Sequence, residues 1–238
     1  MKTPHISLAL AIVLLFPAAG AQRVKTAGMD SCEVHALAVS GTKLFADTHR
    51  PNGVFVTTNN GEIWTAVSNG LPNQVVSTLV VSGTNFLAGT YGDGVFLSTN
   101  DGSTWNAVNS GLVPSPGMAK SYVYVLVLSG TNLLAGTHGG VLISTSIGAS
   151  WTTFKSGLYN AVFDLAVCDT LLIAATAGTG VLRVSNADTS WRESNSGLTC
   201  FYAPALAIST TYLFAATCGV SIHPHCPVVC ISRCVSLI

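Results

Sequence analysis

Short apolar runs separated by turn residues recur along the chain. In the clearest stretch these runs are 75–81, 86–90, 94–98 and 104–109, and all are rich in Val, Leu, Phe and Thr. Runs of this length are typical of strands rather than helices. The segment 82–85, Ser-Gly-Thr-Asn, has the composition of a hairpin turn. The pattern therefore predicts a unit of four antiparallel strands.

This unit repeats along the chain. Its anchor leucines are Leu37, Leu79, Leu126, Leu165 and Leu206. Its closing tryptophans are Trp64, Trp105, Trp151 and Trp191. The period is about 41 residues, which lies in the range of propeller blades. Because no stretch after residue 21 sustains a 3.6-residue period, the sequence predicts an all-β fold, a β-propeller of four-stranded antiparallel blades.

The anchors also predict the limits of the blades. Within repeats covering 34–217, the blades are expected at about 34–70, 75–111, 122–157 and 162–197, with half of a fifth at 205–217. The lead-in, residues 22–33, has little strand pattern with which to complete the fifth blade. We therefore expect an incomplete ring. Its exposed strand edges favour self-association.

The residues before each tryptophan repeat as well. The segment 98–105 reads Ser-Thr-Asn-Asp-Gly-Ser-Thr-Trp, and 57–64 and 144–151 follow the same scheme. These segments resemble the Asp-box, or BNR repeat, whose pattern is Ser-x-Asp-x-Gly-x-Thr-Trp. The resemblance implies a hairpin turn closed by a polar side chain, a left-handed Gly and a buried Trp. The residues expected in these structural roles are Asn59, Gly61, Trp64, Asn100, Gly102, Trp105, Gly148, Trp151 and Trp191.

The resemblance implies a fold more than an activity. Asp-boxes occur in sialidases, sortilin-like receptors, photosystem assembly factors and many exported bacterial proteins. A sialidase needs three arginines, a Tyr with a Glu partner and an Asp acid/base, yet the repeats hold only Arg50, Arg183 and Arg192. We therefore expect a non-enzymatic binding or scaffold module without catalytic residues. The alternative is a sialidase-like glycan hydrolase, and a third interpretation is a photosystem-type assembly factor.

Hairpin alternation predicts a ligand face. Loops that follow the second strand of each blade point the same way as loops between blades. The candidate ligand residues in these loops are His49, Arg50, Tyr91, Asp93, His138, Tyr159 and Tyr202. His and aromatic groups at equivalent places suit a glycan or a peptide or protein ligand. The alternative is that these are ordinary polar loop residues.

The first 21 residues and the overall charge bear on location and partners. Lys2, an apolar stretch at 6–16 and small residues at 19–21 indicate a signal peptide at 1–21, too short to span a membrane. We expect a secreted or periplasmic mature chain without membrane insertion. Charged residues make up 8% of the chain and the net charge is zero, which argues against nucleic acid as a partner. No cofactor is predicted.

The tail, residues 218–238, abandons the repeat pattern and gathers cysteines. We interpret it as the product of a frameshift or truncation, so that the chain is a fragment of a longer propeller. The alternative is a genuine cap that binds zinc, since imidazole and thiolate are preferred zinc ligands. Its candidate ligands are His223, His225, Cys226, Cys230 and Cys234. Their spacing is not one of the usual paired forms.

Overall fold

The computed structural model describes residues 27–29, 33–49, 53–72, 75–112, 114, 118–168, 170–208, 212–217 and 228–233. Within these ranges the chain is all-β, without a helix, and its sheets are antiparallel. The chain divides into two compact units, Met1–Thr90 with Phe96–Ala107, and Tyr91–Val95 with Val108–Ile238. The predicted signal peptide, Arg50 and most of the tail lie outside the described ranges.

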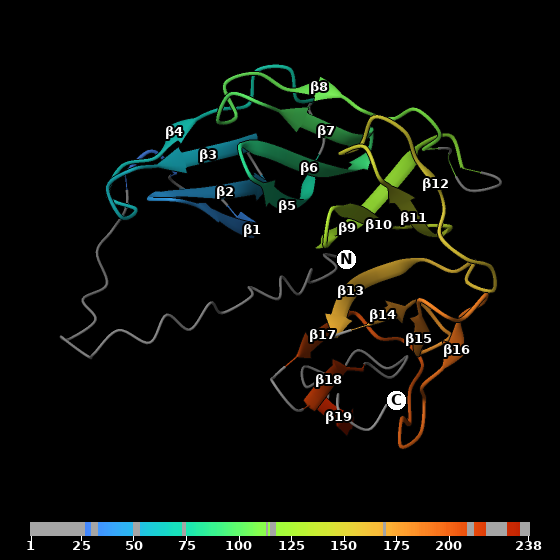
Figure 1. Ribbon diagram of the computed structural model, residues 1–238. Helices are drawn as coiled ribbons and strands as arrows, with labels where there is room; N and C mark the ends of the chain where they lie inside the picture. The colour runs from blue at the N-terminus through green and yellow to red at the C-terminus, as the bar shows by residue number, and fades with distance from the viewer. Residues whose placement is uncertain are drawn as a thin grey trace, which may run out of the picture. The chain divides into compact units, whose positions relative to one another are not determined.

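Four repeats each supply four strands, hydrogen-bonded in chain order (Figure 1). The first holds β1 (Glu33–Ser40), β2 (Lys43–His49), β3 (Gly53–Thr57) and β4 (Thr65–Ala66). The second holds β5 (Val76–Ser82), β6 (Asn85–Gly92), β7 (Gly94–Ser98) and β8 (Asn106–Ala107). The third holds β9 (Ser121–Ser129), β10 (Asn132–Thr137), β11 (Gly140–Ser144) and β12 (Thr152–Thr153). The fourth holds β13 (Val162–Cys168), β14 (Leu171–Thr176), β15 (Val181–Ser185) and β16 (Arg192–Glu193).

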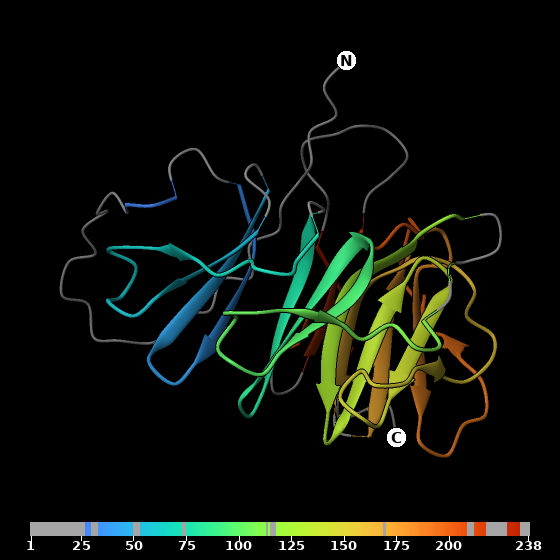
Figure 2. The same cartoon turned by 90° about the horizontal axis from the view of Figure 1, so that it is seen from above.

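The first two strands of each repeat form a tight hairpin. Ser82 pairs with Asn85, which leaves only two residues in the turn, and the same register joins Ser129 to Asn132. In Figure 2 the yellow-green strands of the third repeat lie side by side. Tyr91 and Gly92, at the end of β6, also pair with β9. The turn chemistry of the sequence thus sets the hairpin registers.

The fifth repeat differs from the half blade expected from the sequence. It is a sheet of three strands, β17 (Ala205–Ile208), β18 (Tyr212–Ala216) and β19 (Val228–Arg233). The third strand comes from the tail, which the repeat pattern had excluded. The reason is local composition, because Val-Val-Cys-Ile favours extended backbone even where the turn and tryptophan signals have been lost.

Burial of strand faces between neighbouring repeats builds the cores. In the first unit, Phe45 of β2 and Phe86 of β6 are almost fully buried, with ring centroids 4.3 Å apart. In the second unit, Leu134 of β10 packs in one cluster with Leu165 of β13. A further cluster joins Ile173 and Leu213 of the fourth and fifth repeats. Each repeat therefore relies on its neighbour to bury its apolar face.

Three of the closing tryptophans are buried and hydrogen-bonded to the preceding repeat. Trp105, Trp151 and Trp191 are 4%, 3% and 6% exposed. Their Nε1 groups donate to the carbonyl oxygens of Val67, Val108 and Phe154 at 2.8, 2.8 and 3.3 Å. Trp64 is only half-buried, unlike the equivalent burial expected for all four. The residue corresponding to Val67 would be Lys25, which lies outside the described residues.

The turns before the tryptophans share one hydrogen-bond pattern. Ser98 Oγ accepts a bond from Gly102 N at 2.9 Å, and Asn100 Oδ1 accepts one from Thr104 N at 2.9 Å. Gly102 has φ +81°, a left-handed conformation that favours glycine. Thr57 with Gly61, and Ser144 with Gly148, repeat the first of these bonds at 3.1 and 2.9 Å. Polar side chains thus satisfy the amides of these turns.

The fourth turn is built differently. Asp188, which replaces the glycine, accepts hydrogen bonds from the amide and the hydroxyl of Ser185 at 2.9 and 2.6 Å. Lys155 Nζ donates to the Ser185 carbonyl at 2.7 Å and also to the Asp188 carbonyl. A carboxylate and an ammonium group therefore bind the polar groups of this turn, whereas the side chains of Asn59, Asn100 and Ser146 accept backbone amides in the other three.

Part of the lead-in also belongs to the repeat. Ala27 forms a parallel bridge with Ile63, and its carbonyl accepts the Trp64 amide at 3.0 Å. The Trp105 amide bonds Asn69 in the same way at 2.8 Å, and the Trp151 amide bonds Ser110 at 2.8 Å. The segment Ala27-Gly28-Met29 therefore takes the place that Asn69-Gly70-Leu71 takes one repeat later, a role not foreseen for residues 22–33.

Candidate functional site

A row of aromatic rings crosses four successive repeats in the second unit. It consists of Tyr91 at the end of β6, Tyr124 of β9, Phe163 of β13 and Tyr202 just before β17, and we call it the aromatic row. Successive ring centroids are 5.6, 5.2 and 5.3 Å apart. These separations lie in the range of favourable edge-to-face and tilted aromatic pairs. The row is thus a continuous aromatic surface element.

Two residues of the row lie at irregularities in their strands. Tyr124 and Phe163 each stand two residues before an anchor leucine, and each follows a fully buried valine, Val123 or Val162. Each also lies where the pairing with the neighbouring strand shifts register, between Val123 and Val125 in β9 and between Val162 and Asp164 in β13, and such a bulge changes the direction of a side chain. Tyr91 joins the row because it pairs with Tyr122 of β9.

The rings are accessible to different degrees. Tyr202 is 44% exposed, while Tyr91, Tyr124 and Phe163 are half-buried. Burial raises the pKa of Tyr124, with smaller contributions from the nearby phenols of Tyr91, Tyr122 and Tyr202. The Tyr124 hydroxyl therefore stays neutral at physiological pH and is able both to donate and to accept a hydrogen bond.

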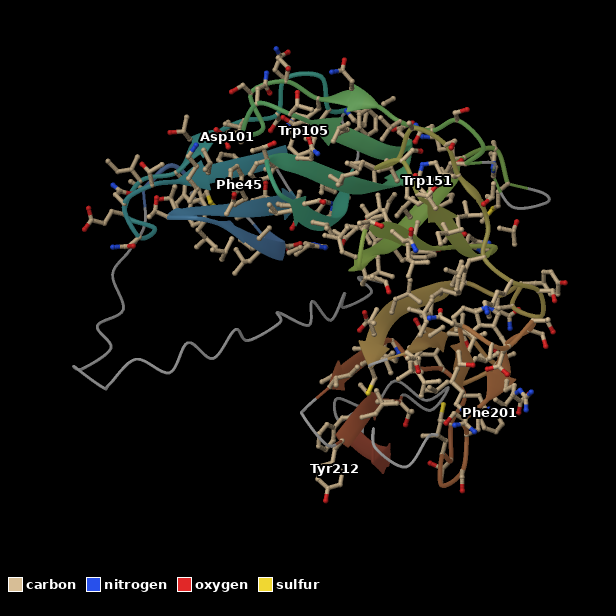
Figure 3. The ribbon with its side chains drawn as sticks, viewed as in Figure 1. Phe45, Asp101, Trp105, Trp151, Phe201 and Tyr212 are labelled. Atoms are coloured by element: carbon tan, nitrogen blue, oxygen red, sulfur yellow. The ribbon has the colours of Figure 1, made fainter. Side chains whose placement is uncertain are left out.

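The segment that carries Tyr202 is held by backbone hydrogen bonds. The Phe201 carbonyl accepts the amides of Gly178 and Gly180 at 3.0 and 2.8 Å, and the Ala203 amide donates to Thr176 at 3.0 Å. Phe201 itself is 49% exposed. Figure 3 labels Phe201 at the orange end of the chain. A fixed backbone with exposed rings is suited to recognition because little order is lost on binding.

The other candidate ligand residues have varied surroundings. The His138 ring lies 6.4 Å from that of Tyr122, and Tyr159 is 76% exposed. The Asp93 carbonyl accepts a hydrogen bond from Asn109 Nδ2 at 2.9 Å. His49 lies in the first unit beside Glu33, and Arg50 lies outside the described residues.

Sequence reasoning missed Tyr122, Tyr124 and Phe163 because it searched only loops. A signal was nonetheless present. Positions two and four residues before the anchor leucine carry aromatic side chains in several repeats. These positions lie near the start of the first strand of a repeat, next to the loop between repeats. Their side chains therefore contribute to the same face as the loops.

Two buried aspartates have perturbed acidity. Asp47 is fully buried, and burial raises its pKa to about 8, although its Oδ1 accepts the Ala36 amide. Its Oδ2 is buried without a hydrogen-bond partner among the described residues. Burial raises the pKa of Asp164 to about 6. Hydrogen bonds from the amides of Leu206 and Leu165, at 2.7 and 2.8 Å, lower this pKa by less than burial raises it. Both carboxyl groups bind backbone amides, which gives them a structural role.

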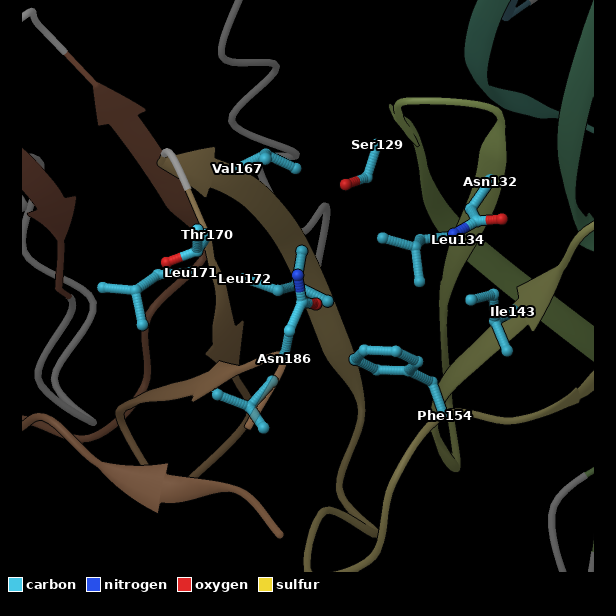
Figure 4. A pocket seen from close by; sticks show the side chains of 11 residues that line it. Ser129, Asn132, Leu134, Ile143, Phe154, Val167, Thr170, Leu171, Leu172 and Asn186 are labelled. Atoms are coloured by element: carbon cyan, nitrogen blue, oxygen red, sulfur yellow. The ribbon is translucent and has the colours of Figure 1, made fainter. Parts of the chain in front are cut away.

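Hollows in the second unit are small. One of about 60 Å³ lies between the third and fourth repeats, with Phe154 and Leu134 among its lining residues (Figure 4). Another of about 170 Å³ is lined by Arg183, Arg192 and Asp188 together with Leu171 and Ser185. Small-molecule pockets usually measure about 300–1,000 Å³. The aromatic row, a partly exposed surface, is therefore the better candidate site.

Comparison with solved structures identifies the fold. The chain is similar to the extracellular domain of the putative one-component system BT4673 from B. thetaiotaomicron, with a TM-score of 0.65 and 18% identity over 78% of this chain and 26% of that one. It is similar to the GH74 xyloglucanase from Xanthomonas campestris, with a TM-score of 0.62 and 16% identity over 81% and 35%. It is also similar to YCF48, solved bound to D1 peptide, with a TM-score of 0.58 and 11% identity over 76% and 60%.

The chain is thus an all-β protein with the β-propeller fold, as predicted from its repeat. It spans from about a quarter to three fifths of the length of these three structures. At these identities the likeness concerns the fold alone. No known family matches the chain, and no curated protein matches it. Within the described residues, no helix is long and apolar enough to cross a membrane.

Proposed function

We propose that the chain is a non-enzymatic β-propeller module that binds an extended glycan along the aromatic row. The observation that carries this proposal is the unbroken spacing of four rings, 5.6, 5.2 and 5.3 Å apart, across four successive repeats. Aromatic rings offer apolar faces to sugar rings, and tyrosine hydroxyls offer hydrogen bonds to sugar hydroxyls. An elongated surface suits a chain of sugars better than a single small molecule, which needs an enclosed pocket.

A glycan hydrolase is the second candidate, because GH74 enzymes are among the similar structures. Most glycoside hydrolases use two carboxyl groups that reach the substrate. The two carboxyl groups with raised pKa, Asp47 and Asp164, instead bind backbone amides. This arrangement favours binding over catalysis. A photosystem-type assembly role, as the likeness to YCF48 would suggest, implies a protein ligand on the same face.

Two further features belong to this proposal. The turns before Trp64, Trp105 and Trp151 are Asp-boxes, which the shared hydrogen bonds from Gly61, Gly102 and Gly148 support. The mature protein is exported, as the segment at 1–21 indicates.

The test is binding of xyloglucan oligosaccharides to the mature chain, followed by calorimetry and by the release of reducing sugar. We expect saturable binding without turnover, and a loss of affinity of about tenfold for Tyr202→Ala, equal to the value of one aromatic contact. Tyr212→Ala is the matched control, because the Tyr212 ring contacts Phe214 in β18, outside the aromatic row. Turnover of the oligosaccharide would support the hydrolase, and binding only to peptides would overturn the glycan assignment.

A further inference from the structure

Three metal-ligating side chains meet in the first unit. Glu33 and His35 lie on β1 and His49 lies at the end of β2, and their ligand atoms are all within 4.8 Å of one another. His49 Nδ1 is 3.3 Å from Glu33 Oε2. The two imidazole rings meet edge to face, with centroids 5.6 Å apart and planes at 77°. We call this group the Glu33 cluster.

The hairpin backbone brings these side chains together. Glu33 and His49 are directly opposite each other in the register of β1 and β2. Residues directly opposite in an antiparallel pair have Cβ atoms about 4.5–5.5 Å apart. His35 is two residues after Glu33, where the register of β1 and β2 shifts between Val34 and Leu37, and its ligand atom still lies within 4.8 Å of those of Glu33 and His49. One short hairpin thus positions all three groups without help from a distant loop.

The same three positions hold other residue types in other repeats. Two of them stand four and two residues before the anchor leucine, and the third follows the threonine near the end of the second strand. In the third repeat these positions are occupied by Tyr122, Tyr124 and His138, which are aromatic or belong to the aromatic surface. Only the first repeat places metal-ligating types at all three. The Glu33 cluster is therefore a specialised version of the position set that builds the aromatic row.

We propose that the Glu33 cluster is a binding site for Zn²⁺ or a similar divalent transition metal, with Glu33, His35 and His49 as its protein ligands. Two imidazoles and one carboxylate form a known zinc ligand set that leaves a fourth position open. Zn–N and Zn–O distances of about 2.0–2.2 Å place tetrahedral ligand atoms roughly 3.3–3.5 Å apart. The 3.3 Å between His49 Nδ1 and Glu33 Oε2 already meets this requirement. The remaining pairs of ligand atoms are also within 4.8 Å of one another.

The cluster is open to solvent. The Glu33 side chain is 67% exposed and the His49 side chain is 24% exposed. An ion therefore has an entry path, and water or a ligand group occupies the fourth position. The negative charge of the Glu33 carboxylate also offsets part of the charge of the cation. Two neutral imidazoles alone do not supply such a charge.

The test is titration of chelator-treated mature protein with ZnCl₂ at pH 7.5, followed by calorimetry and by thermal unfolding. We expect one equivalent of Zn²⁺ to bind and to raise the melting temperature, because the ion binds the folded hairpin. His35→Gln and His49→Gln should each weaken binding by at least about a hundredfold. Glu33→Gln, at an exposed site, tests the carboxylate with little risk to folding.

His138→Gln is the matched control, since His138 takes the place of His49 in the third repeat and should leave Zn²⁺ affinity unchanged. Replacement of zinc with Co²⁺ should give visible d–d bands without a thiolate charge-transfer band. Unchanged binding in both His35→Gln and His49→Gln would overturn the proposal. So would a thiolate band that Cys226→Ser abolishes, because the ion would then sit in the cysteine-rich tail.

Discussion

Asp47 is a buried carboxyl group, and its contribution to the free energy of unfolding depends on whether it is ionised. Its side chain is fully buried on β2, and burial raises its pKa to about 8 from 3.8. Between these two values the unfolded chain has released the proton while the folded chain keeps it. The free energy of unfolding therefore falls as pH rises from about 4 to about 8, by up to roughly 1.4 kcal/mol per pH unit, and levels off above pH 8.

We expect Asp47→Asn to remove this dependence. The amide has nearly the same shape as a neutral carboxyl group but does not ionise, so the variant should be more stable than wild type at pH 8.5 and similar to it near pH 4. The measurement is urea unfolding at half-unit steps from pH 4 to 9. Asp101→Asn, at an exposed ion pair with Lys43, is the control and should keep the wild-type slope. Equal slopes in Asp47→Asn and wild type would contradict the raised pKa.

Tryptophan burial differs between the first repeat and the others. Trp105 is 4% exposed and donates to the Val67 carbonyl, whereas Trp64 is half-buried. We expect Trp105→Ala to lower the free energy of unfolding by about 3–5 kcal/mol, the range for large aromatic residues in cores. Trp64→Ala should lower the free energy of unfolding by less than half as much as Trp105→Ala. Urea unfolding followed by circular dichroism gives both values, and equal costs would show that Trp64 is covered as well as Trp105.

At the scale of an element, Gly111 allows the turn that contains it to lie close to the backbone of Trp151. It has φ +81°, and a Cβ at this position would lie 2.2 Å from the carbonyl oxygen of Trp151. Gly130 has φ +61° but open space around the same position. We therefore expect Gly130→Ala to cost about 1 kcal/mol from backbone strain alone. Gly111→Ala should lower the free energy of unfolding by clearly more than Gly130→Ala, because the Trp151 backbone has to move.

Thermal unfolding of the two glycine variants, measured with wild type in one buffer, separates the effects of conformation and contact. A similar loss in both would mean that positive φ alone sets the cost. A melting temperature of Gly111→Ala close to wild type would contradict the close approach to Trp151.

Elements with a strong local signal were predictable from the sequence, and those built by pairing with distant residues were not. The two-residue hairpin turns and the spacing of the tryptophans are local properties, so the four-stranded repeats were predicted. The strand at Val228–Arg233 and the pairing of Ala27 with Ile63 depend on partners elsewhere in the chain. The aromatic row was half predicted. Tyr91 and Tyr202 lie at strand ends or in loops, whereas Tyr124 and Phe163 lie within strands and become neighbours only through packing of repeats.

At the scale of the whole molecule, contacts between repeats determine how the chain holds together. Asp164 of the fourth repeat accepts the amide of Leu206 in the fifth at 2.7 Å, across 42 residues. It also accepts the amide of Leu165 at 2.8 Å. One carboxylate with two acceptor oxygens thus joins two repeats.

We expect Asp164→Asn to loosen the fifth repeat. An asparagine side chain has only one acceptor oxygen, so one of the two buried amides loses its partner, at a cost of about 1–3 kcal/mol. Hydrogen exchange at Leu206 and its neighbours in β17 should become faster, while β10 should exchange as in wild type. Faster exchange throughout the second unit would instead indicate a global loss of stability, and unchanged exchange at Leu206 would show that the carboxylate does not join the repeats.

The bonds made by the tryptophan indoles also have a direction along the chain. Trp105 donates to Val67, Trp151 to Val108 and Trp191 to Phe154, so the acceptor always precedes the donor by 37 to 43 residues. A ribosome synthesises a protein from its N-terminus, so the residue that accepts each of these hydrogen bonds is made before the tryptophan itself. Each new repeat therefore emerges onto a surface that is already present, and the order of translation matches the order of packing.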